Sequence, residues 1–384
     1  MTVDPAEVTL AALAGPDAAA VLAGLRSDQP VAWVPVLDAW LVGTYDLAVA
    51  VMRDATTFTV DDPGFSTARV VGPSMLSLDG AEHLRHRRPF GQIFRASQVA
   101  ARFGPDTSAL AAELVAAVRP AGVADLRAEL AGPLSVAVVT AALGLRGADA
   151  ATVLRWYAAI VGAVTDITAG TPPGAEAATA MADLAAAVQA VLDSGQDSLL
   201  ASAAPALSPA EVTSNAAVIM FGGIDTTEGM ITNTLLHVLR DDELVAALRA
   251  DRSGLDAVVE ESLRLEPAAS VVDRYATADV TLAGASIRRG DLVRVSLLAA
   301  NRDPAIFPDP DTFDPTRPNL EDQLAFARGP HSCLAMDLAR LETRAALTAV
   351  LDGLPGIGLA GPVDVRGLVF RKPDALPTIW DPVD

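Results

Sequence analysis

The chain has 384 residues, 51 % of them hydrophobic, and the apolar residues are spread along its whole length. We therefore expect one large core and a single domain over residues 1–384. The 28 basic residues against 48 acidic ones give a net charge of −20, which argues against nucleic acid as a partner, because phosphate binding needs a basic surface.

The N-terminal segment lacks the features of a signal peptide or membrane anchor. Asp4, Pro5, Glu7 and Pro16 interrupt it before an apolar run reaches the roughly 20 residues that a membrane span needs. We expect a cytoplasmic protein with no membrane partner. Cys333 is the only cysteine, so an internal disulfide is excluded and a zinc site with about four Cys and His ligands is not expected.

Helical patterns dominate the chain. Alanine- and leucine-rich stretches with helical spacing run from about residue 106 to 192 and from about 211 to 252. Residues 279–297 show three short strand patterns with a glycine turn after the first, whereas the Pro and Ser content of residues 201–209 predicts a loop. The sequence thus predicts a mainly α protein with a small β region (α+β).

One long helix is predicted in the middle of the chain. Ser208 as N-cap, Pro209 at the first helical position and Glu211 two residues later form a capping box. Nothing interrupts the helical pattern before Arg240. Such a helix is about 45 Å long at 1.5 Å per residue.

The middle of this helix is weakened at one place. Gly222 and Gly223 are adjacent, and Asp225 and Thr226 follow inside an otherwise apolar stretch. Each glycine costs about 1 kcal/mol relative to alanine in a helix. Two interpretations remain open from these residues alone: a notch where another helix packs closely, or a groove where a ligand lies against bare backbone beside an acid–alcohol pair that moves protons.

The stretch FARGPHSCLA, residues 326–335, contains Cys333 just before a predicted helix. The free N–H groups and dipole of a helix N-terminus favour a thiolate and lower the pKa of a thiol. Gly329 and Ala335 keep bulk away from the loop. The alternative is a buried structural cysteine.

Three further segments carry charged residues in suggestive patterns. EESLRLEP, residues 260–267, places Glu261 and Arg264 three apart on one helical face, where they can form an ion pair. HLRHRRPF, residues 83–90, places His83 and Arg87 four apart on one face, and Arg274 lies in DRYA just before the predicted strands.

Taken in chain order, these motifs resemble the bacterial cytochrome P450 family of haem-thiolate monooxygenases. The resemblance runs from about residue 58 to residue 380 through MLSLDGAEHLRHRR, GGIDTT, ExxR, NRDPAIFPDPDTFDPTRP and FxxGxHxC. Each motif alone is weak, but the ordered set is specific. The resemblance implies the cytochrome P450 fold as one domain, with the long central helix over a haem b cofactor. Its smaller β part would come from the N-terminal region and from about 270–300 and 363–380.

The resemblance also implies functions for single residues. Cys333 matches the axial thiolate ligand of the haem iron, whose electron donation favours cleavage of the O–O bond. Asp225 and Thr226 match the acid–alcohol pair that organises water and delivers protons. The remaining haem contacts would be His83, Arg87, Gly222, Gly223, Arg274, Phe326 and His331, with the arginines and histidines on the propionates.

A third group would support the haem loop, and a fourth would contact substrate. Glu261 and Arg264 match the ExxR pair, and Arg317 matches the third member of that structural network. The substrate contacts implied by the family are Val71, Val218, Phe221, Ala269, Val271, Val272 and Val369. Two positions depart from the family pattern: Gly222 stands where alanine is usual, and Ala335 stands where glycine is usual. Both residues are small, so we expect haem binding to survive.

The resemblance predicts an enzyme of secondary metabolism or catabolism that inserts one atom of O2 into a small, largely apolar molecule. Electrons would come from a ferredoxin and its reductase, with Arg328 and Arg340 available to dock the acidic ferredoxin. The alternatives are a peroxide-driven or coupling oxidase and a non-catalytic haem protein. Asp225 and Thr226 argue against the peroxide route, because O2 needs a proton relay and H2O2 does not.

Overall fold

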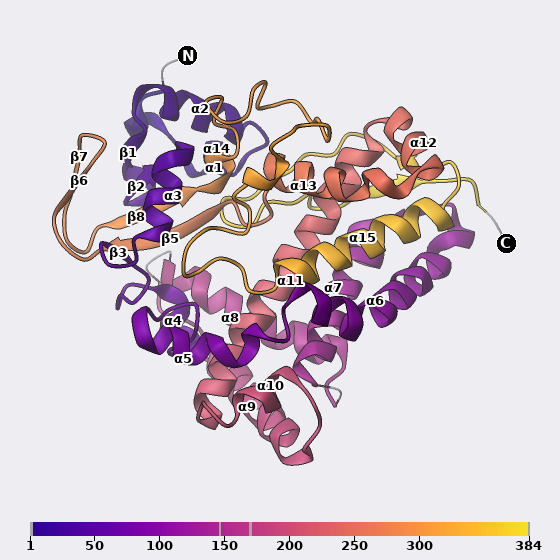
Figure 1. Ribbon diagram of the computed structural model, residues 1–384, viewed down its shortest axis with the longest axis horizontal. Helices are drawn as coiled ribbons and strands as arrows, with labels where there is room; N and C mark the ends of the chain where they lie inside the picture. The colour runs from indigo at the N-terminus through magenta and orange to yellow at the C-terminus, as the bar shows by residue number, and fades with distance from the viewer. Residues whose placement is uncertain (1–2, 146, 169–170, 383–384) are drawn as a thin grey trace. The chain divides into compact units, whose positions relative to one another are not determined.

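The computed structural model describes residues 3–145, 147–168 and 171–382, and it divides into two compact units (Figure 1). Unit 1 comprises Met1–Thr59, Asp106–Gly132 and Thr226–Asp384, and unit 2 comprises Val60–Pro105 and Pro133–Asp225. A unit defined by its internal contacts is not by itself a domain that folds alone, so the single domain over residues 1–384 stays a prediction.

Every strand named in the described part of the chain belongs to unit 1. The strands are β1 (Val31–Val34), β2 (Ala39–Val42), β3 (Phe58–Thr59), β4 (Val123–Asp125), β5 (Val271–Ala276), β6 (Val280–Leu282), β7 (Ala285–Ile287), β8 (Leu292–Ser296), β9 (Gly358–Leu359) and β10 (Pro377–Ile379). Five form a sheet in the order β1-β2-β8-β5-β3, where only β2 and β8 pair in parallel. The order β4-β10-β9 forms a second sheet, and β6 pairs with β7.

The central strand β8 explains why the main sheet forms. Its valines, Val293 and Val295, are fully buried, and they belong to a core with Val42, Val51 and Met52. The two valines alternate along the strand with Arg294, which pairs with Asp273. Side chains two residues apart share one face of a sheet, so this face of β8 contributes to the core.

The three-strand pattern at residues 279–297 is confirmed. Ala283 and Gly284 have φ angles of 49° and 87° and form the two-residue turn between β6 and β7. Two positive φ angles give the turn a twist that suits a hairpin. Strand β8 then follows as the third strand.

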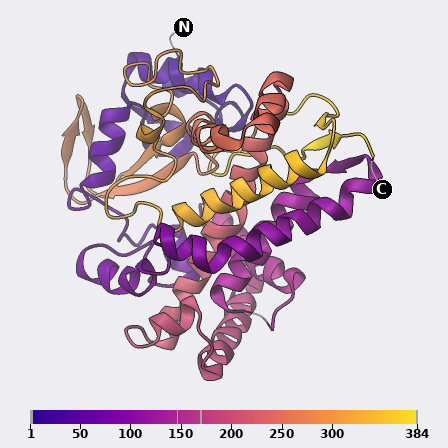
Figure 2. The same cartoon turned by 45° about the vertical axis from the view of Figure 1, so that its right-hand side comes forward.

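The helices of unit 1 pack against these sheets and against one another. They are α1 (Leu10–Ala14), α2 (Ala18–Asp28), α3 (Tyr45–Arg53), α12 (Asp242–Ala250), α13 (Leu255–Leu265), α14 (Leu297–Ala300) and α15 (Met336–Gly353). Helix α6 (Ala96–Val118) begins in unit 2 and ends in unit 1. Its end lies beside α15 in Figure 2, so close that a Cβ added at Gly353 would come within 2.5 Å of Val115.

Unit 2 is helical throughout the part that the structure describes. It contains α4 (Ser66–Val71), α5 (Gly80–Gly91), α8 (Ala150–Thr168), α9 (Ala175–Ser194), α10 (Leu199–Ala203) and nearly all of α7 (Gly132–Leu143). By length and composition alone, α8 and α9 could cross a membrane, a test that core helices of other proteins also pass. Helices α8 and α9 pack against each other, and α4 packs on α8.

The long central helix is confirmed as α11 (Pro209–Leu239). The backbone N–H of Ser208 donates to Glu211 Oε2 at 2.8 Å, and the N–H of Glu211 donates to Ser208 Oγ at 3.4 Å. This reciprocal pair is the predicted capping box. The boundary between the two units falls inside α11, after Asp225.

Three expectations about local structure are wrong. The loop predicted for residues 201–209 begins with the end of α10, because Ser198 caps that helix by accepting from the N–H of Ala201. Arg274 lies within β5 rather than before the strands. Strand β4 lies in a stretch expected to be helical, because it pairs with β10 from the far end of the chain.

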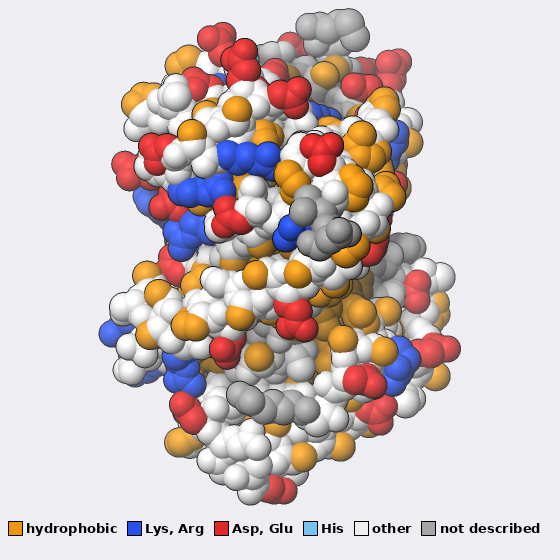
Figure 3. All heavy atoms as spheres, turned by 90° about the vertical axis from the view of Figure 1, so that its right-hand side faces the viewer, with side chains coloured by type: hydrophobic (Ala, Val, Ile, Leu, Met, Phe, Trp, Pro, Cys, Tyr) orange, Lys and Arg blue, Asp and Glu red, His pale blue; other side chains and the backbone are white. Residues whose placement is uncertain are grey.

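The charges on one face of the molecule are mixed. Figure 3 shows acidic side chains scattered over one face of the molecule, and basic side chains lie between them. No single acidic cluster dominates this face. The charge therefore favours solubility more than it marks a particular binding surface.

Candidate functional site

The segment around Cys333 is a tight loop at the start of α15, in unit 1. The backbone N–H of Cys333 donates to the carbonyl of Phe326 at 2.8 Å, and the N–H of Ser332 donates to Gly329 at 3.1 Å. Gly329 has a φ of 80°, and a Cβ there would collide with the backbone of Met52. The half-buried cysteine, which forms no disulfide, lies three residues before α15, where the helix N-terminus favours the thiolate.

Phe326 backs this loop. Its ring is buried in a cluster with Met230, Val259, Leu263 and Ala268, and Cys333 packs against the same cluster. Apolar packing on this side shields the sulfur from water. The cysteine is thus supported by the core while its own side chain stays half-buried.

Arg340 covers the outer side of Phe326. Its guanidinium lies 4.7 Å from the ring centroid, a cation–π contact. The same guanidinium makes a bidentate pair with Glu260, at 2.6 and 2.9 Å. Arg340 is held in place beside the cysteine loop, because Glu260 balances its charge. Arg328, in the same loop, donates to the carbonyl of Glu321 at 3.0 Å.

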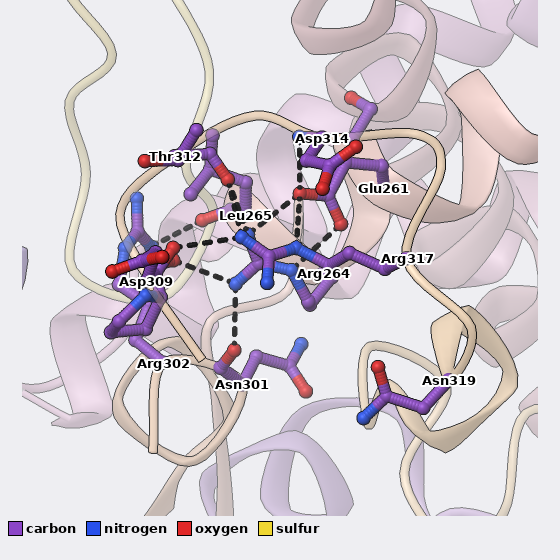
Figure 4. Close-up of polar contacts among 12 residues, drawn as sticks. Glu261, Arg264, Leu265, Asn301, Arg302, Asp309, Thr312, Asp314, Arg317 and Asn319 are labelled. Atoms are coloured by element: carbon purple, nitrogen blue, oxygen red, sulfur yellow. Dashed lines mark hydrogen bonds and ion pairs between the residues drawn. The ribbon is translucent and has the colours of Figure 1, made fainter. Parts of the chain in front are cut away.

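Glu261, Arg264 and Arg317 meet in one buried network (Figure 4). Glu261 Oε2 accepts from Arg264 Nε at 2.7 Å, and Oε1 accepts from Arg264 Nη2 at 2.8 Å and Arg317 Nε at 3.0 Å. The N–H of Asp314 also donates to Oε1, at 2.8 Å. Both side chains of the ExxR pair are fully buried.

Arg264 uses its whole donor capacity in this network. A guanidinium has five N–H groups, and besides the two bonds to Glu261 it donates to the carbonyls of Asn301, Pro310 and Thr312 at 3.0, 2.8 and 3.0 Å. These carbonyls lie on the irregular segment after α14, which leads to the cysteine loop. One side chain therefore organises a long stretch of backbone that lacks regular hydrogen bonds of its own.

Two other predicted haem contacts lie in unit 1. Arg274 is buried in β5, with 4 % of its surface exposed, and donates from Nη1 to the carbonyl of Asp273 at 2.7 Å. His331 is half-buried in the cysteine loop. Asp273 also pairs with Arg294 at 2.7 Å, so its carboxylate is occupied by a different arginine.

Unit 2 holds the other predicted propionate donors. His83 and Arg87 lie four residues apart on α5, which places them on one helical face as expected. His83 is buried and Arg87 is half-buried. A buried cation or imidazole donor needs a polar partner, and a propionate would supply one.

The two glycines of α11 differ. A Cβ added at Gly223 would lie 2.9 Å from Val139 Cγ2 on α7, whereas a Cβ at Gly222 would meet no atom within 4 Å. The packing interpretation therefore holds for Gly223. Gly222 faces open space, which the groove interpretation requires, and Asp225 and Thr226 are half-buried one turn further on.

The residues predicted to contact substrate divide between the units. Val71 ends α4, and Val218 and Phe221 lie on α11, all in unit 2. The rest belong to unit 1: Ala269, Val271, Val272 and Val369. Within unit 1 they are brought together by a bridge between Ala269 and Phe370, which places Val369 beside the start of β5 with 39 % of its surface exposed.

The sequence analysis missed a charged cluster two residues after Thr226. Glu228 is buried on α11 and forms ion pairs with Arg127 at 2.6 Å and Lys372 at 2.7 Å. Nearby, Asn233 donates to the carbonyls of Glu266 and Arg371 at 3.0 Å. Lys372 is the only lysine of the chain. Its uniqueness was the one sequence signal that could have pointed to this cluster.

The donor set fits a haem. A thiolate is a soft ligand that suits iron, and arginine and histidine side chains suit carboxylates such as the propionates. Within unit 1, Cys333, Arg274 and His331 carry such groups, and within unit 2, His83 and Arg87 do. In the described part of the chain no group of three or more His, Cys, Asp and Glu residues could hold a metal ion by itself.

His237 gives a pH-dependent stability prediction for unit 1. It is buried on α11, its Nδ1 lies 3.0 Å from Ser262 Oγ, and burial lowers its pKa to about 4. The unfolded chain takes up a proton below about pH 6.5, but the folded chain does so only near pH 4. Stability present above pH 6.5 is therefore lost as the pH falls, by about 2 kcal/mol between pH 7 and pH 5.

The variant His237→Gln should lose this part of the acid sensitivity. We expect its thermal midpoint to fall less than that of the wild type between pH 7 and pH 5, because glutamine does not titrate. Midpoints measured by circular dichroism at several pH values provide the comparison. Parallel curves for the two proteins would show that His237 is charged in the folded state or does not contribute.

Comparison with known proteins gives a consistent result. A family model described as Cytochrome P450 matches residues 188–353. The chain is 34 % identical to the cytochrome P450 monooxygenase PikC of Streptomyces venezuelae, over 93 % of this chain and 89 % of that protein. It is also 34 % identical to the mycinamicin IV hydroxylase/epoxidase of Micromonospora griseorubida, over 89 % and 90 %.

A solved structure extends the similarity to the fold. The crystal structure of CalO2 is 27 % identical, covers 99 % of each chain and has a TM-score of 0.87. The mainly helical architecture with a small β region is therefore shared along the whole chain.

Proposed function

The chain belongs to the cytochrome P450 family and is a haem-dependent monooxygenase, and from this premise we propose that it inserts one atom of O2 into a small, largely apolar organic molecule. The observation that supports the proposal is the half-buried thiol of Cys333, held at the start of α15 and packed against the cluster of Phe326. One bacterial relative is named a monooxygenase and another a mycinamicin IV hydroxylase/epoxidase, and this is the class of reaction we propose here.

When bound, the haem, which we propose to be haem b, supplies the iron at which O2 is activated. Cys333 would bind that iron through its sulfur, and the network of Glu261, Arg264 and Arg317 would keep the cysteine loop in place. The proposed donors to its propionates are Arg274 and His331 in unit 1. His83 and Arg87 are the proposed donors in unit 2.

Proton transfer would be carried out by the acid–alcohol pair of α11. Thr226 Oγ1 would hold a water molecule and donate a hydrogen bond to the reacting oxygen, and the Asp225 carboxylate would pass protons to that water. Gly222 supports this arrangement, because it leaves open space on the same helix one turn earlier. Gly223 packs closely against Val139, and it would also contribute to the surface of α11 that faces the haem.

The substrate would be apolar because the residues proposed to contact it are. In unit 2 these residues are Val71, Val218 and Phe221, and in unit 1 they are Ala269, Val271, Val272 and Val369. Burial of aliphatic surface against such side chains contributes about 25 cal/mol per Å2. Charged substrates would lose hydration without a matching partner among these residues.

Electrons would come from a ferredoxin and its reductase in the cytoplasm. Arg328 is the candidate for docking the acidic ferredoxin near the cysteine loop, whereas Arg340 would act mainly by holding Phe326, since it is paired with Glu260. A coupling reaction on the same scaffold is the second candidate. The acid–alcohol pair favours an O2-driven reaction over a peroxide-driven one.

Replacing Thr226 tests the monooxygenase proposal. A screen for compounds that shift the haem spectrum, with mycinamicin IV as the first probe, supplies the substrate. For Thr226→Ala we expect product formation to fall by about 10- to 100-fold while NADH consumption continues, because a general acid contributes about this much or more. Released hydrogen peroxide, measured by a peroxidase assay, should rise accordingly.

Two control variants frame this measurement. Thr226→Ser keeps the hydroxyl and should retain most of the coupling between NADH and product. Thr227→Ala removes the buried hydroxyl of the next residue and should leave the coupling unchanged. Full coupling in Thr226→Ala would remove Thr226 from the proton relay.

A further inference from the structure

The segment that links α4 to α5, residues 72–79, is attached to α11 at two points inside unit 2. Ser214 Oγ donates to the carbonyl of Val71 at 2.6 Å, just before the segment. The backbone N–H of Met75 donates to Asn215 Oδ1 at 2.9 Å, in the middle of the segment. Two consecutive residues of α11 thus hold both the start and the centre of this irregular stretch.

The segment is also folded on itself. The N–H of Ser77 donates to the carbonyl of Ser74 at 3.1 Å, and the N–H of Ser74 donates to Ser77 Oγ at 3.1 Å. Ser74, Met75 and Ser77 are all buried. The middle of the segment is therefore held both by its own hydrogen bonds and by the bond from Met75 to α11.

Asn215 is fully buried, and both the oxygen and the nitrogen of its side-chain amide form hydrogen bonds. Besides accepting from Met75, its Nδ2 donates to the carbonyl of Glu211 at 2.7 Å and to His86 Nδ1 at 2.9 Å. Since Oδ1 accepts from Met75, Nδ2 must face His86, and His86 Nδ1 must be an acceptor. His86 Nε2 lies 3.4 Å from Glu211 Oε1 and 3.2 Å from Arg85 Nη2.

Glu211 completes the arrangement. Its carboxylate pairs with Arg85 of α5, and its hydrogen bonds from Arg85 and from the N–H of Ser208 lower its pKa to about 2. The residue that caps α11 thus also holds the α5 side of the network. The sequence analysis assigned Glu211 to the capping box alone.

Asn215, which holds the 72–79 segment, lies on the same face of α11 as a proposed substrate contact. Val218 is three residues after Asn215, and Gly222, with open space above it, follows four residues later. Residues at these spacings share one helical face, and from residue 215 to residue 222 the axis rises by about 10 Å. Val71, itself a proposed substrate contact, is held to the same face through Ser214.

We propose that Asn215 is a positioning residue for substrate selectivity: by holding Met75 and His86 against α11, it determines where the 72–79 segment borders the substrate. This inference rests on the proposed function, because it takes the space beside Gly222 as the place where substrate lies. Asn215 touches neither substrate nor haem and acts through Met75 and Val71.

The test is Asn215→Leu compared with Asn233→Leu. Both asparagines are fully buried on α11, but Asn233 donates to the carbonyls of Glu266 and Arg371 in unit 1. Leucine matches asparagine in size and cannot accept from the Met75 N–H. The two variants therefore remove equivalent amides from one helix, and only one of them touches the 72–79 segment.

Two readouts are needed. Hydrogen–deuterium exchange of peptides covering residues 72–79 should accelerate about 5- to 10-fold in Asn215→Leu, which is the loss of one hydrogen bond, and stay unchanged in Asn233→Leu. Optical titration of the haem protein with imidazole and with 4-phenylimidazole should show the ratio of their two dissociation constants changing about 5- to 10-fold only in Asn215→Leu, because the larger ligand would be the one sensitive to a change in the space that substrate occupies.

Each outcome decides something. Equal exchange in the two variants, or a ratio that Asn233→Leu changes as much, overturns the proposal. If Asn215→Leu does not fold, Ser214→Ala provides the same comparison by removing the bond to the carbonyl of Val71. If neither azole shifts the spectrum of the wild-type protein, the proposed haem site fails, while the exchange measurement still decides whether Asn215 positions the segment.

Discussion

Replacing Cys333 by serine should abolish the red-shifted absorption band that a thiolate-bound haem shows when reduced and exposed to CO. The hydroxyl of serine is a far weaker donor than a thiolate and stays protonated at neutral pH, so iron loses the electron-rich ligand that the family uses. We expect complete loss of the band and of monooxygenase turnover. The loop itself should persist, because Cys333 is held by a backbone hydrogen bond to Phe326.

The control is Ser332→Ala, which changes the neighbouring residue of the same loop and should keep the band. Circular dichroism of Cys333→Ser separates loss of the ligand from loss of the fold. A band of unchanged position and intensity in Cys333→Ser would contradict the assignment of the thiolate, and with it the proposed site in unit 1.

Replacing Arg264 by lysine should destabilise the protein by about 3–5 kcal/mol, the usual cost of breaking a buried ion pair by changing one partner. A lysine has three donors and no planar fork, whereas Arg264 makes five hydrogen bonds to Glu261 and to three backbone carbonyls. At least two of these five hydrogen bonds would be lost. Thermal unfolding and the yield of haem-loaded protein report the loss.

Arg344→Lys is the matched control, because the pair between Arg344 and Asp256 is exposed, with side-chain exposures of 41 % and 73 %. Exposed pairs contribute at most about 1 kcal/mol, so this variant should unfold close to the wild-type midpoint. Equal midpoints for Arg264→Lys and Arg344→Lys would show that the buried network does not stabilise the segment that leads to the cysteine loop.

The packing interpretation applies to one of the paired glycines of α11, and the groove interpretation applies to the other. The sequence could not separate them, because both glycines weaken the helix equally. The structure separates them by neighbour: Gly223 meets Val139 of α7, and Gly222 meets open space. A substitution at Gly223 would therefore disturb packing within unit 2, while one at Gly222 would fill the space that the proposed function assigns to the reaction.

Local signals predicted the helices well and the shortest strands poorly. The capping box at Ser208 and Glu211 located the start of α11, and the glycine turn at Gly284 located the β6–β7 hairpin. Both depend on interactions between near neighbours. Strand β4 was missed because three residues carry no period, and only its pairing with β10, some 250 residues later, makes it a strand.

The residues of the candidate site were likewise predictable only where they lie close together in the sequence. The motifs around Cys333, Glu261 and His83 were recognisable because each one is compact in sequence. The cluster of Glu228 with Arg127 and Lys372 was not, since its three members come from distant parts of the chain. No spacing rule connects residues that meet only after folding.

The sequence by itself determined the family resemblance, the long helix α11 and the identity of the one available thiolate, because these depend on residue type and on short-range spacing. Only the tertiary structure decided which glycine of α11 packs and which leaves space, how Arg264 uses its five donors, and that Asn215 holds Met75 from 140 residues away. Those features depend on which buried polar groups find partners, and a partner far along the chain is chosen by packing rather than by local sequence.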